Sequence, residues 1–114
     1  IKKIDSYEYQ DCWFVEMPFY NKGDLYSRHL RTFISNVEYM KWISQINAVI
    51  KYLHSRHITH NDLKLNNILL DDDNNIIIID FGCALENTND FNSDKQSFNR
   101  IQEKLKSKLQ LSKL

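Results

Sequence analysis

The sequence predicts an α+β fold, mostly helical, in which a small β-hairpin carries the most informative polar residues. Residues from about 36 to 53 repeat apolar side chains at three- and four-residue steps, which is typical of a helix packed on a core. Two short apolar stretches, 68–70 and 76–79, flank a polar turn and predict the hairpin. A final Lys-rich segment returns to the helical spacing. A chain of 114 residues has room for one domain.

The first elements are expected to be a strand, a turn and a short helix. Residues 13–17 (Trp-Phe-Val-Glu-Met) favour a strand, which would end at Pro18. The polar segment 21–24, with a glycine at its third position, predicts a turn. Asp24 is then a good N-cap for a helix that runs to about Arg31.

The long helix is expected to begin at Ser35 or Asn36, both of which are favourable N-cap residues. Trp42 and Tyr52 are predicted to be half exposed. The stripe that faces the core is predicted to comprise Val37, Met40, Ile43, Ile46, Ile50 and Leu53. His54 and His57 follow the stripe, and they are expected to be capping or surface residues.

The acidic hairpin loop, residues 71–75, raises the question of calcium binding. It lacks the central Gly and the terminal Glu of calcium-binding loops, so a solvated turn is expected. The last helix is predicted from the spacing of Phe98, Ile101, Leu105, Leu109 and Leu111.

Composition limits which classes of binding partner and which cellular compartment are expected. The formal net charge is zero, which gives no argument for binding nucleic acid or an acidic membrane. No apolar run approaches the ~20 residues of a membrane-spanning helix, and no signal peptide is visible. Cys12 and Cys83 lack metal-ligand spacing, so two buried or semi-buried thiols are expected in a reducing intracellular compartment, the cytoplasm, or the host cytoplasm if the source is viral. The chain begins with Ile1, and we expect it to be a piece of a longer protein.

The candidate site lies at the ends of the two hairpin strands. The segment 60–67 (His-Asn-Asp-Leu-Lys-Leu-Asn-Asn) runs into the first strand, and the second strand ends in Asp80-Phe81-Gly82. Two carboxylates and an amide in such places suit phosphoryl transfer from a metal-bound nucleotide. One carboxylate orients a hydroxyl, while the amide and the other carboxylate hold the metal.

These residues resemble the motifs of the protein kinase family, whose catalytic loop reads H-R-D-L-K-x-x-N and is followed by D-F-G. Here the loop reads H-N-D-L-K-L-N-N, with the family's order and spacing. The resemblance covers residues 12–82 well and the rest loosely. It implies a protein-kinase-like fold for residues 1–114, taken as a partial domain. Residues 1–22 would supply the last N-lobe strand and the hinge, and residues 23–114 the front half of the C-lobe.

The resemblance also implies roles, with ATP and Mg²⁺ as cofactors and a protein substrate. Asp62 would orient the attacking hydroxyl, and Lys64 would neutralise charge on the transferring phosphoryl group. Asn67 and Asp80 would bind Mg²⁺ and, through it, the nucleotide. His60 would be structural, packed beneath the Asp-Phe-Gly turn.

Met17, Pro18 and Tyr20 would form the adenine-binding hinge. Met17 falls at the family's gatekeeper position, and the Pro18 carbonyl and the Tyr20 N–H would contact adenine. Pro18 has no N–H, but only its carbonyl is needed there. A strand that simply ends at a proline remains the alternative.

The sequence departs from the family pattern in three ways. The Gly-rich loop, strand lysine and helix glutamate are absent, which leaves a partner protein or a missing N-lobe segment to complete the site. Asn61 replaces the arginine that pairs with a phosphorylated loop, so switching by loop phosphorylation is not expected. No A-P-E triplet is present, and Asp94 follows the D-F-G closely. Asp94 resembles the aspartate that holds the catalytic-loop backbone, with an ordinary helix cap as the alternative.

Three functions remain open at this point. The first is phosphoryl transfer from ATP to a protein Ser/Thr hydroxyl, favoured by Lys64 two residues after Asp62. The second is a minimal atypical kinase or ATPase that works in a complex, supported by the short segment after Gly82. The third is a non-catalytic binding module that mimics a kinase. The missing N-lobe motifs support it, and the four retained site residues oppose it.

Overall fold

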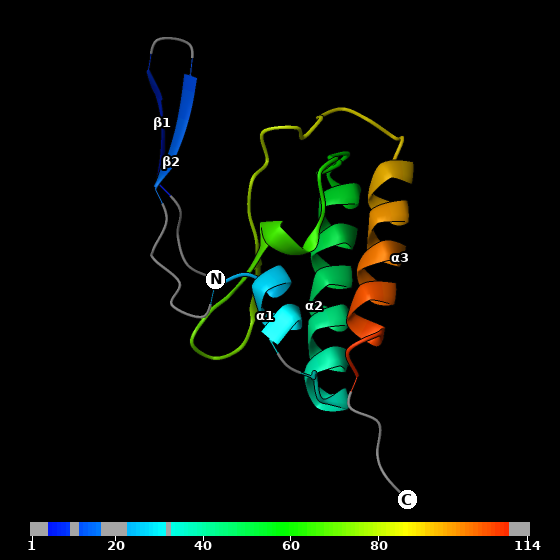
Figure 1. The fold of residues 1–114 in the computed structure, drawn as a ribbon. Coiled ribbons are helices and arrows are strands. Elements are labelled where there is room, and N and C mark those ends of the chain that lie inside the picture. The colour runs from blue at the N-terminus through cyan, green and yellow to red at the C-terminus, as the bar shows by residue number, and fades with distance from the viewer. Residues whose placement is uncertain (1–4, 10–11, 17–22, 32, 110–114) are drawn as a thin grey trace, which may run out of the picture.

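The computed structural model describes residues 5–9, 12–16, 23–31 and 33–109, and these form an α+β arrangement that is mostly helical (Figure 1). The elements in chain order are β1 (Asp5–Tyr9), β2 (Cys12–Glu16), α1 (Leu25–Arg31), α2 (Asn36–Ser55), a short 3₁₀ helix (Leu65–Asn67), β3 (Ile68–Leu70), β4 (Ile76–Ile78) and α3 (Asn92–Lys106). The predicted fold class is confirmed. Among the described residues, no helix is long and apolar enough to cross a membrane.

The first hairpin joins β1 and β2 in antiparallel register, with Asp5 opposite Glu16 and Tyr9 opposite Cys12. The strand predicted over residues 13–17 is therefore present one residue earlier, and β1 was not predicted. The segment Asp-Ser-Tyr-Glu-Tyr carries only a short polar–aromatic alternation, which is a weak strand signal by itself. Met17 lies outside the described residues.

Asp24 caps α1, as predicted. Its carboxylate accepts a hydrogen bond of 2.7 Å from the Ser27 N–H. Gly23 has a φ of +72°, which glycine adopts without strain, and its carbonyl accepts from the Leu70 N–H at 2.9 Å. This bond holds the start of α1 against β3.

Helix α2 begins with a capping box. The Ser35 hydroxyl accepts from the Glu38 N–H at 3.0 Å, and the Glu38 carboxylate accepts from the Ser35 N–H at 3.3 Å. Arg28 of α1 donates to the same carboxylate at 3.1 Å. The N-cap is thus Ser35, which is one of the two residues predicted for this role.

The buried face of α2 differs from the predicted stripe at its N-terminal end. Val37 is 78% exposed and Met40 58% exposed, whereas Trp42 is fully buried. The residues that α2 buries are Tyr39, Trp42, Ile46, Ile50 and Leu53. Trp42 can be buried because its indole N–H donates to the Asn74 carbonyl at 3.1 Å, so its polar group keeps a partner. Tyr39 and Trp42 therefore face the core in place of the expected Val37 and Met40. Tyr52 is exposed.

The hairpin of β3 and β4 forms as predicted, with Ile68 opposite Ile78 and Leu70 opposite Ile76. Its acidic loop is a tight turn, in which Asp71 Oδ1 accepts from the N–H groups of Asn75 and Asp73 at 2.9 Å each. The Asn75 N–H in particular lowers the pKa of Asp71. The loop's oxygens thus serve the turn and its contacts with α2.

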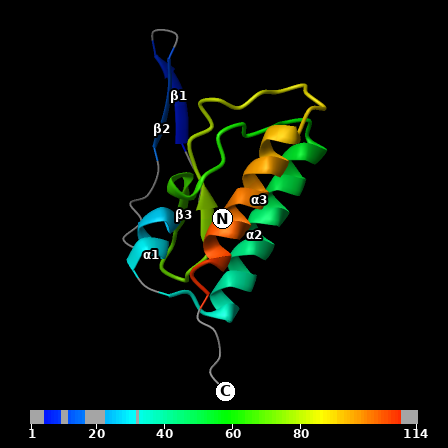
Figure 2. The ribbon, with the colours of Figure 1, turned by 45° about the vertical axis from the view of Figure 1, so that its right-hand side comes forward.

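Helix α3 runs alongside α2 (Figures 1 and 2). Its core residues include the predicted Ile101 and Leu105, with Phe98 partly buried. The predicted Leu109 lies beyond the end of the helix, where it forms an isolated parallel bridge with Ile34. Leu111 lies outside the described residues. One core thus joins α1, α2, α3 and the second hairpin.

Candidate active site

Residues 60–67, which connect the end of α2 to β3, form a loop that is fixed at its start. The N–H groups of His60 and Asn61 each donate to one oxygen of the Asp94 carboxylate at 2.9 Å. Asn61 has a φ of +68°, and a left-handed residue in such a pair lets successive N–H groups converge on one anion. The 60–67 loop therefore starts from a fixed point on α3.

Asp94 is a fully buried charged anchor. Its Oδ2 also lies 2.9 Å from Nε2 of His54. Burial acts to raise the pKa of Asp94, but the bond from His54 and the two backbone N–H donors outweigh burial, and the pKa lies below its ordinary value. The resemblance implied this anchoring role, and it is confirmed. The alternative of a helix cap is wrong, since no side chain caps the start of α3.

The expectation that His54 is a capping or surface residue is wrong. Its side chain is 14% exposed, and its ring stacks on Phe91 with centroids 4.0 Å apart and an interplanar angle of 13°. The available signal was its place directly after Leu53, at the edge of the buried face of α2. His57, by contrast, is exposed just beyond α2, as expected.

His60 connects the loop to the strand end that leads to Asp80. Its Nδ1 accepts from the Asp62 N–H at 3.1 Å, and its Nε2 lies 2.8 Å from the Ile79 carbonyl. These two bonds assign the neutral tautomer with hydrogen on Nε2. The ring also lies 4.6 Å from the ring of Phe81. The predicted structural role of His60 beneath the Asp-Phe-Gly turn is confirmed.

Asp62, Lys64 and Asn67 come together within the loop. The Asn67 amide nitrogen donates to the Asp62 main-chain carbonyl at 2.9 Å and to the Asp62 carboxylate at 3.3 Å. Lys64 Nζ lies 3.8 Å from the other carboxylate oxygen. Lys64 is exposed and Asp62 half-buried, so the pair is open to a ligand.

Asp80 follows β4 on the neighbouring strand end. The Ile79 N–H donates to the Asn67 carbonyl at 2.9 Å, which extends the β3–β4 pairing as far as the residue before Asp80. Asp80 has a φ of +62°, and its Oδ1 accepts weakly from the Gly82 N–H at 3.4 Å. Its carboxylate is exposed, close in the chain to the strand end that holds Asn67.

Residues 83–91, here named the strap, lie along the chain from His57 to Asn61. Thr59 and Leu85 exchange two backbone hydrogen bonds of 3.0 Å, and the Thr88 N–H donates to the His57 carbonyl at 3.0 Å. The Asn61 side chain donates to the Cys83 carbonyl at 3.4 Å. The Cys83 thiol is free and exposed, so the expectation of a buried or semi-buried thiol is wrong at this position. Uncharged groups thus hold the strap along its length, and α3 begins directly after it.

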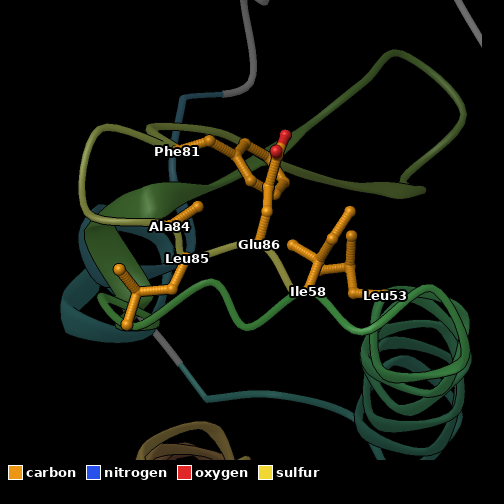
Figure 3. A pocket seen from close by; sticks show the side chains of 6 residues that line it. All are labelled: Leu53, Ile58, Phe81, Ala84, Leu85 and Glu86. Atoms are coloured by element: carbon orange, nitrogen blue, oxygen red, sulfur yellow. The ribbon is translucent and has the colours of Figure 1, made fainter. Parts of the chain in front are cut away.

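A shallow, largely apolar pocket is lined in part by Phe81 of the Asp-Phe-Gly turn (Figure 3). Its lining combines the end of α2, the segment after it and the strap: Leu53, Ile58, Phe81, Ala84, Leu85 and Glu86. It contains none of Asp62, Lys64, Asn67 and Asp80. The pocket is therefore separate from the polar cluster.

The polar cluster offers oxygen donors of the kind that Mg²⁺ prefers. The side-chain nitrogen of Asn67 donates to Asp62. The side-chain oxygen, Oδ1, is therefore the atom of Asn67 that can bind a metal. Asp80 adds an exposed carboxylate. Among the described residues, no three His, Cys, Asp or Glu side chains gather into a metal-binding group. A metal here would complete its shell with phosphate and water oxygens, as Mg²⁺ commonly does.

The predicted hinge residues Met17, Pro18 and Tyr20 lie outside the described residues, and their expected contacts with adenine stay a prediction. The four polar side chains, in contrast, all lie in described segments.

Comparisons with known proteins agree with this arrangement. The family model described as "Protein kinase domain" matches residues 1–101. The chain is 38% identical over 85 residues to human NUAK family SNF1-like kinase 1, covering 74% of this chain and 13% of that protein. It is 35% identical over 80 residues to cAMP-dependent protein kinase catalytic subunit 2 of Drosophila melanogaster, covering 69% of this chain and 23% of that protein. Human testis-specific serine/threonine-protein kinase 4 is 57% identical over 44 residues, or 39% of this chain and 13% of that protein.

The chain belongs to the protein kinase domain family, and it forms part of such a domain. It spans only about an eighth to a quarter of the length of these curated relatives. The resemblance inferred from the sequence is confirmed.

Proposed function

We propose that the protein transfers the γ-phosphoryl group of ATP, with Mg²⁺, to a Ser or Thr hydroxyl of a protein. The observation that carries this proposal is the cluster of Asp62, Lys64 and Asn67 on a loop anchored by Asp94. Phosphoryl transfer depends mainly on positioning and on electrostatic stabilisation, so a fixed loop with these groups suits it. The names of the relatives, which include a serine/threonine-protein kinase, support this reaction class.

In this mechanism, each side chain has one task. The Asp62 carboxylate accepts a hydrogen bond from the acceptor hydroxyl and directs its oxygen toward the phosphoryl group. Lys64, next to that carboxylate, places a positive charge where negative charge develops. Asn67 and Asp80 would hold Mg²⁺, which when bound would neutralise phosphate charge. Residues 1–22 would supply the last N-lobe strand and the hinge, and residues 23–114 the C-lobe portion.

A second candidate function is a minimal atypical kinase or ATPase that works within a complex. The observation that favours it is the strap, which joins the Asp-Phe-Gly turn to α3 with only residues 83–91. Hydrogen bonds to residues 57–61 occupy its backbone, which leaves little chain to form a platform for a peptide. The two candidates share the same chemistry and differ in the acceptor.

The metal role can be tested by thermal unfolding of the complete chain with ATP, with and without Mg²⁺. A ligand at a hundredfold excess over its Kd stabilises a protein by about 2.7 kcal/mol, roughly 10 °C in Tm for a domain of this size. We expect a Mg²⁺-dependent rise in Tm that Asp80→Asn abolishes. The matched control is Asp72→Asn, an exposed carboxylate of the hairpin turn. An equal rise in the Asp80 variant would remove Asp80 from the metal role.

The role of Asp62 is tested by Asp62→Ala in a phosphoryl-transfer assay. Because Asp62 acts on the acceptor, we expect kcat to fall by about 10²–10⁴, with nucleotide affinity nearly unchanged. A large loss of nucleotide affinity would contradict this assignment.

A further inference from the structure

The start of α2 exposes large apolar side chains that lie close together in the chain. Val37 is 78% exposed, Met40 is 58% exposed, and Phe33, which comes just before the capping box, is 62% exposed. A single exposed apolar side chain is ordinary on a protein surface, but several together are typical of an interaction site. We name Phe33, Val37 and Met40 the apolar patch.

The helical repeat places the apolar patch between the second hairpin and α3, both of which α2 contacts. Successive helical residues turn by about 100°, so Val37 and Met40 project on the side of α2 opposite the buried Trp42. By the same count, Gln45, which bonds to the hairpin, lies on one side of the patch. His54, which contacts α3, lies on the other side.

The flank of the apolar patch on the hairpin side is acidic. The hairpin turn carries Asp72 and Asp73, and both side chains are exposed. Lys41 holds this turn on α2, because its Nζ donates to the Asp73 main-chain carbonyl at 2.8 Å. Lys41 offsets part of the negative charge, and two carboxylates on the turn leave this flank negative.

The flank on the α3 side is basic. Helices α2 and α3 run in opposite directions, so the end of α3 lies beside the start of α2 (Figures 1 and 2). The last turn of α3 carries Lys104 and Lys106, both exposed. The chain after α3 then bonds to the segment before α2, where the Ile34 N–H donates to the Lys108 carbonyl at 2.7 Å.

Opposite charges on the two sides of an apolar patch make this surface complementary to a second copy of itself. If two copies pack patch to patch about a two-fold axis parallel to α2, the acidic flank of each copy faces the basic flank of the other. A two-fold axis perpendicular to α2 in the plane of contact would instead bring like flanks together. Charge therefore selects the occupant and its orientation.

We propose that the apolar patch and its two charged flanks form a homodimer interface, with the α2 helices of two copies side by side and parallel. Val37 and Met40 pack against their counterparts about the two-fold axis. The exposed Lys51 lies further along the same face, so the two helices diverge toward their C-terminal ends. This interface has fewer residues than the 20–30 a side of a standard one, so the dimer is weak, with a Kd on the order of 10⁻⁴ M. The proposal does not depend on phosphoryl transfer.

Sedimentation equilibrium of the complete chain measures the association. Between about 10 µM and 1 mM, we expect the average mass to rise from that of one chain toward that of two. Raising the salt from about 0.05 to 0.5 M should weaken the association at least tenfold, because salt screens the flanks. Val37→Lys combined with Met40→Lys should leave a folded monomer. Gln96→Lys, at an exposed position near the other end of α3, is the matched control and should dimerise like the unmodified chain.

Charge reversal tests the complementarity itself. Asp72→Lys with Asp73→Lys makes both flanks basic, and Lys104→Glu with Lys106→Glu makes both flanks acidic. We expect each of these double variants to stay monomeric alone. Their equimolar mixture should form a heterodimer, and the chain with all four substitutions should dimerise again, because its flanks are opposite once more.

Three results would overturn the proposal. The first is an unmodified chain that stays monomeric throughout; a Met40 methyl group shielded from a soluble paramagnetic probe in that monomer would assign the patch to another segment of the same chain. The second is a dimer that the two lysine substitutions in the patch do not weaken. The third is a double charge variant that dimerises as strongly as the unmodified chain.

Discussion

The two ends of α2 are anchored in different ways. At the N-terminal end, Ser35 and Glu38 form a capping box, and the ion pair of Glu38 with Arg28 spans ten positions of sequence. At the C-terminal end, His54 contacts Asp94, forty positions away. The first anchor stabilises the helix itself. It also joins the helix to the second hairpin, because the Asn74 side chain donates to Glu38 at 3.3 Å. The second anchor fixes the 60–67 loop, which carries Asp62 of the candidate active site.

The two ends also differ in burial, which sets the expected energies. The Glu38 side chain is 26% exposed, and an ion pair that water can reach contributes little to stability. Asp94 is fully buried and has donors from three residues. Removing one partner of such a buried group is far more costly than removing an exposed one. The same helix therefore has a tolerant end and a sensitive end.

The largest effect is expected for Asp94→Ala. It leaves the N–H groups of His60 and Asn61 and the His54 ring without their shared acceptor, so the free energy of unfolding should fall by about 3–5 kcal/mol. Urea denaturation measures this. Asp94→Asn is the control, because its amide oxygen can still accept one of the three bonds and the loss should be smaller. A loss below about 1 kcal/mol for the alanine variant would remove Asp94 as the anchor.

Acid should weaken the C-terminal end of α2 through Asp94. Its pKa lies below the ordinary value of 3.8 in the folded chain, because its hydrogen bonds outweigh burial. The group therefore stabilises the fold fully above about pH 3.8, and this stability is lost as the pH falls through the folded-state pKa. We expect the free energy of unfolding to decline there by at most about 1.4 kcal/mol per pH unit for this group.

Urea titrations between pH 2 and 6 test this decline. Glu38, whose pKa is lowered from 4.5 because bonds from Ser35 and Arg28 outweigh burial, adds a slope in the same direction at slightly higher pH. Comparing Asp94→Asn with Glu38→Gln separates the two ends. If the free energy of unfolding fell with pH equally steeply in Asp94→Asn and in the unmodified chain, the acid sensitivity could not be assigned to Asp94.

A smaller effect is expected for Ser35→Ala at the N-terminal end. Removing the hydroxyl leaves the Glu38 N–H without its partner in the capping box, which typically costs about 1 kcal/mol. This substitution should leave amide hydrogen exchange at His60 and Asn61 unchanged, because these N–H groups are held at the other end of α2. Ser35→Thr, which keeps the hydroxyl, should stay within a few tenths of the unmodified stability. Altered loop exchange in the alanine variant would show that the two ends are coupled after all.

The smallest effect is expected where the predicted core stripe was wrong. Val37→Lys and Met40→Lys change exposed side chains, so each should alter the free energy of unfolding by no more than about 0.5 kcal/mol. Trp42→Ala is the comparison, because it removes a fully buried ring and should cost about 3–5 kcal/mol. A decrease of more than about 2 kcal/mol in the free energy of unfolding for Val37→Lys would support the predicted position of Val37 in the core.

The sequence predicted the elements that are defined by local patterns. Asp24 and Ser35 are caps that act on neighbouring N–H groups, and the hairpin follows from two apolar runs around a polar turn. The N-terminal end of the α2 stripe was mispredicted because Trp42 is buried. Its indole N–H finds a partner in Asn74, which is far along the chain. Periodicity alone contains no information about such a partner. Strand β1 was missed because its polar residues give little strand signal.

The candidate site was predicted from spacing and resemblance, and the roles of Asp62, Lys64, Asn67 and Asp80 remain predictions to be tested. The structure brings Asp62, Lys64 and Asn67 into contact, and the β3–β4 pairing brings Asp80 to the adjacent strand end. His54 escaped prediction because its role exists only once α2, the strap and α3 are assembled. A histidine at the end of a helix has many possible partners, and no local rule selects Asp94 among them.

Five described residues other than glycine have a left-handed backbone, and three of them are Asn61, Asn74 and Asn87. The whole chain has only two glycines. Asparagine is among the few residues that tolerate this conformation, so it occupies places where glycine would also fit. Replacing these asparagines with glycine would keep the backbone conformation, but at Asn61 and Asn74 it would remove side-chain hydrogen bonds to the Cys83 carbonyl and to Glu38.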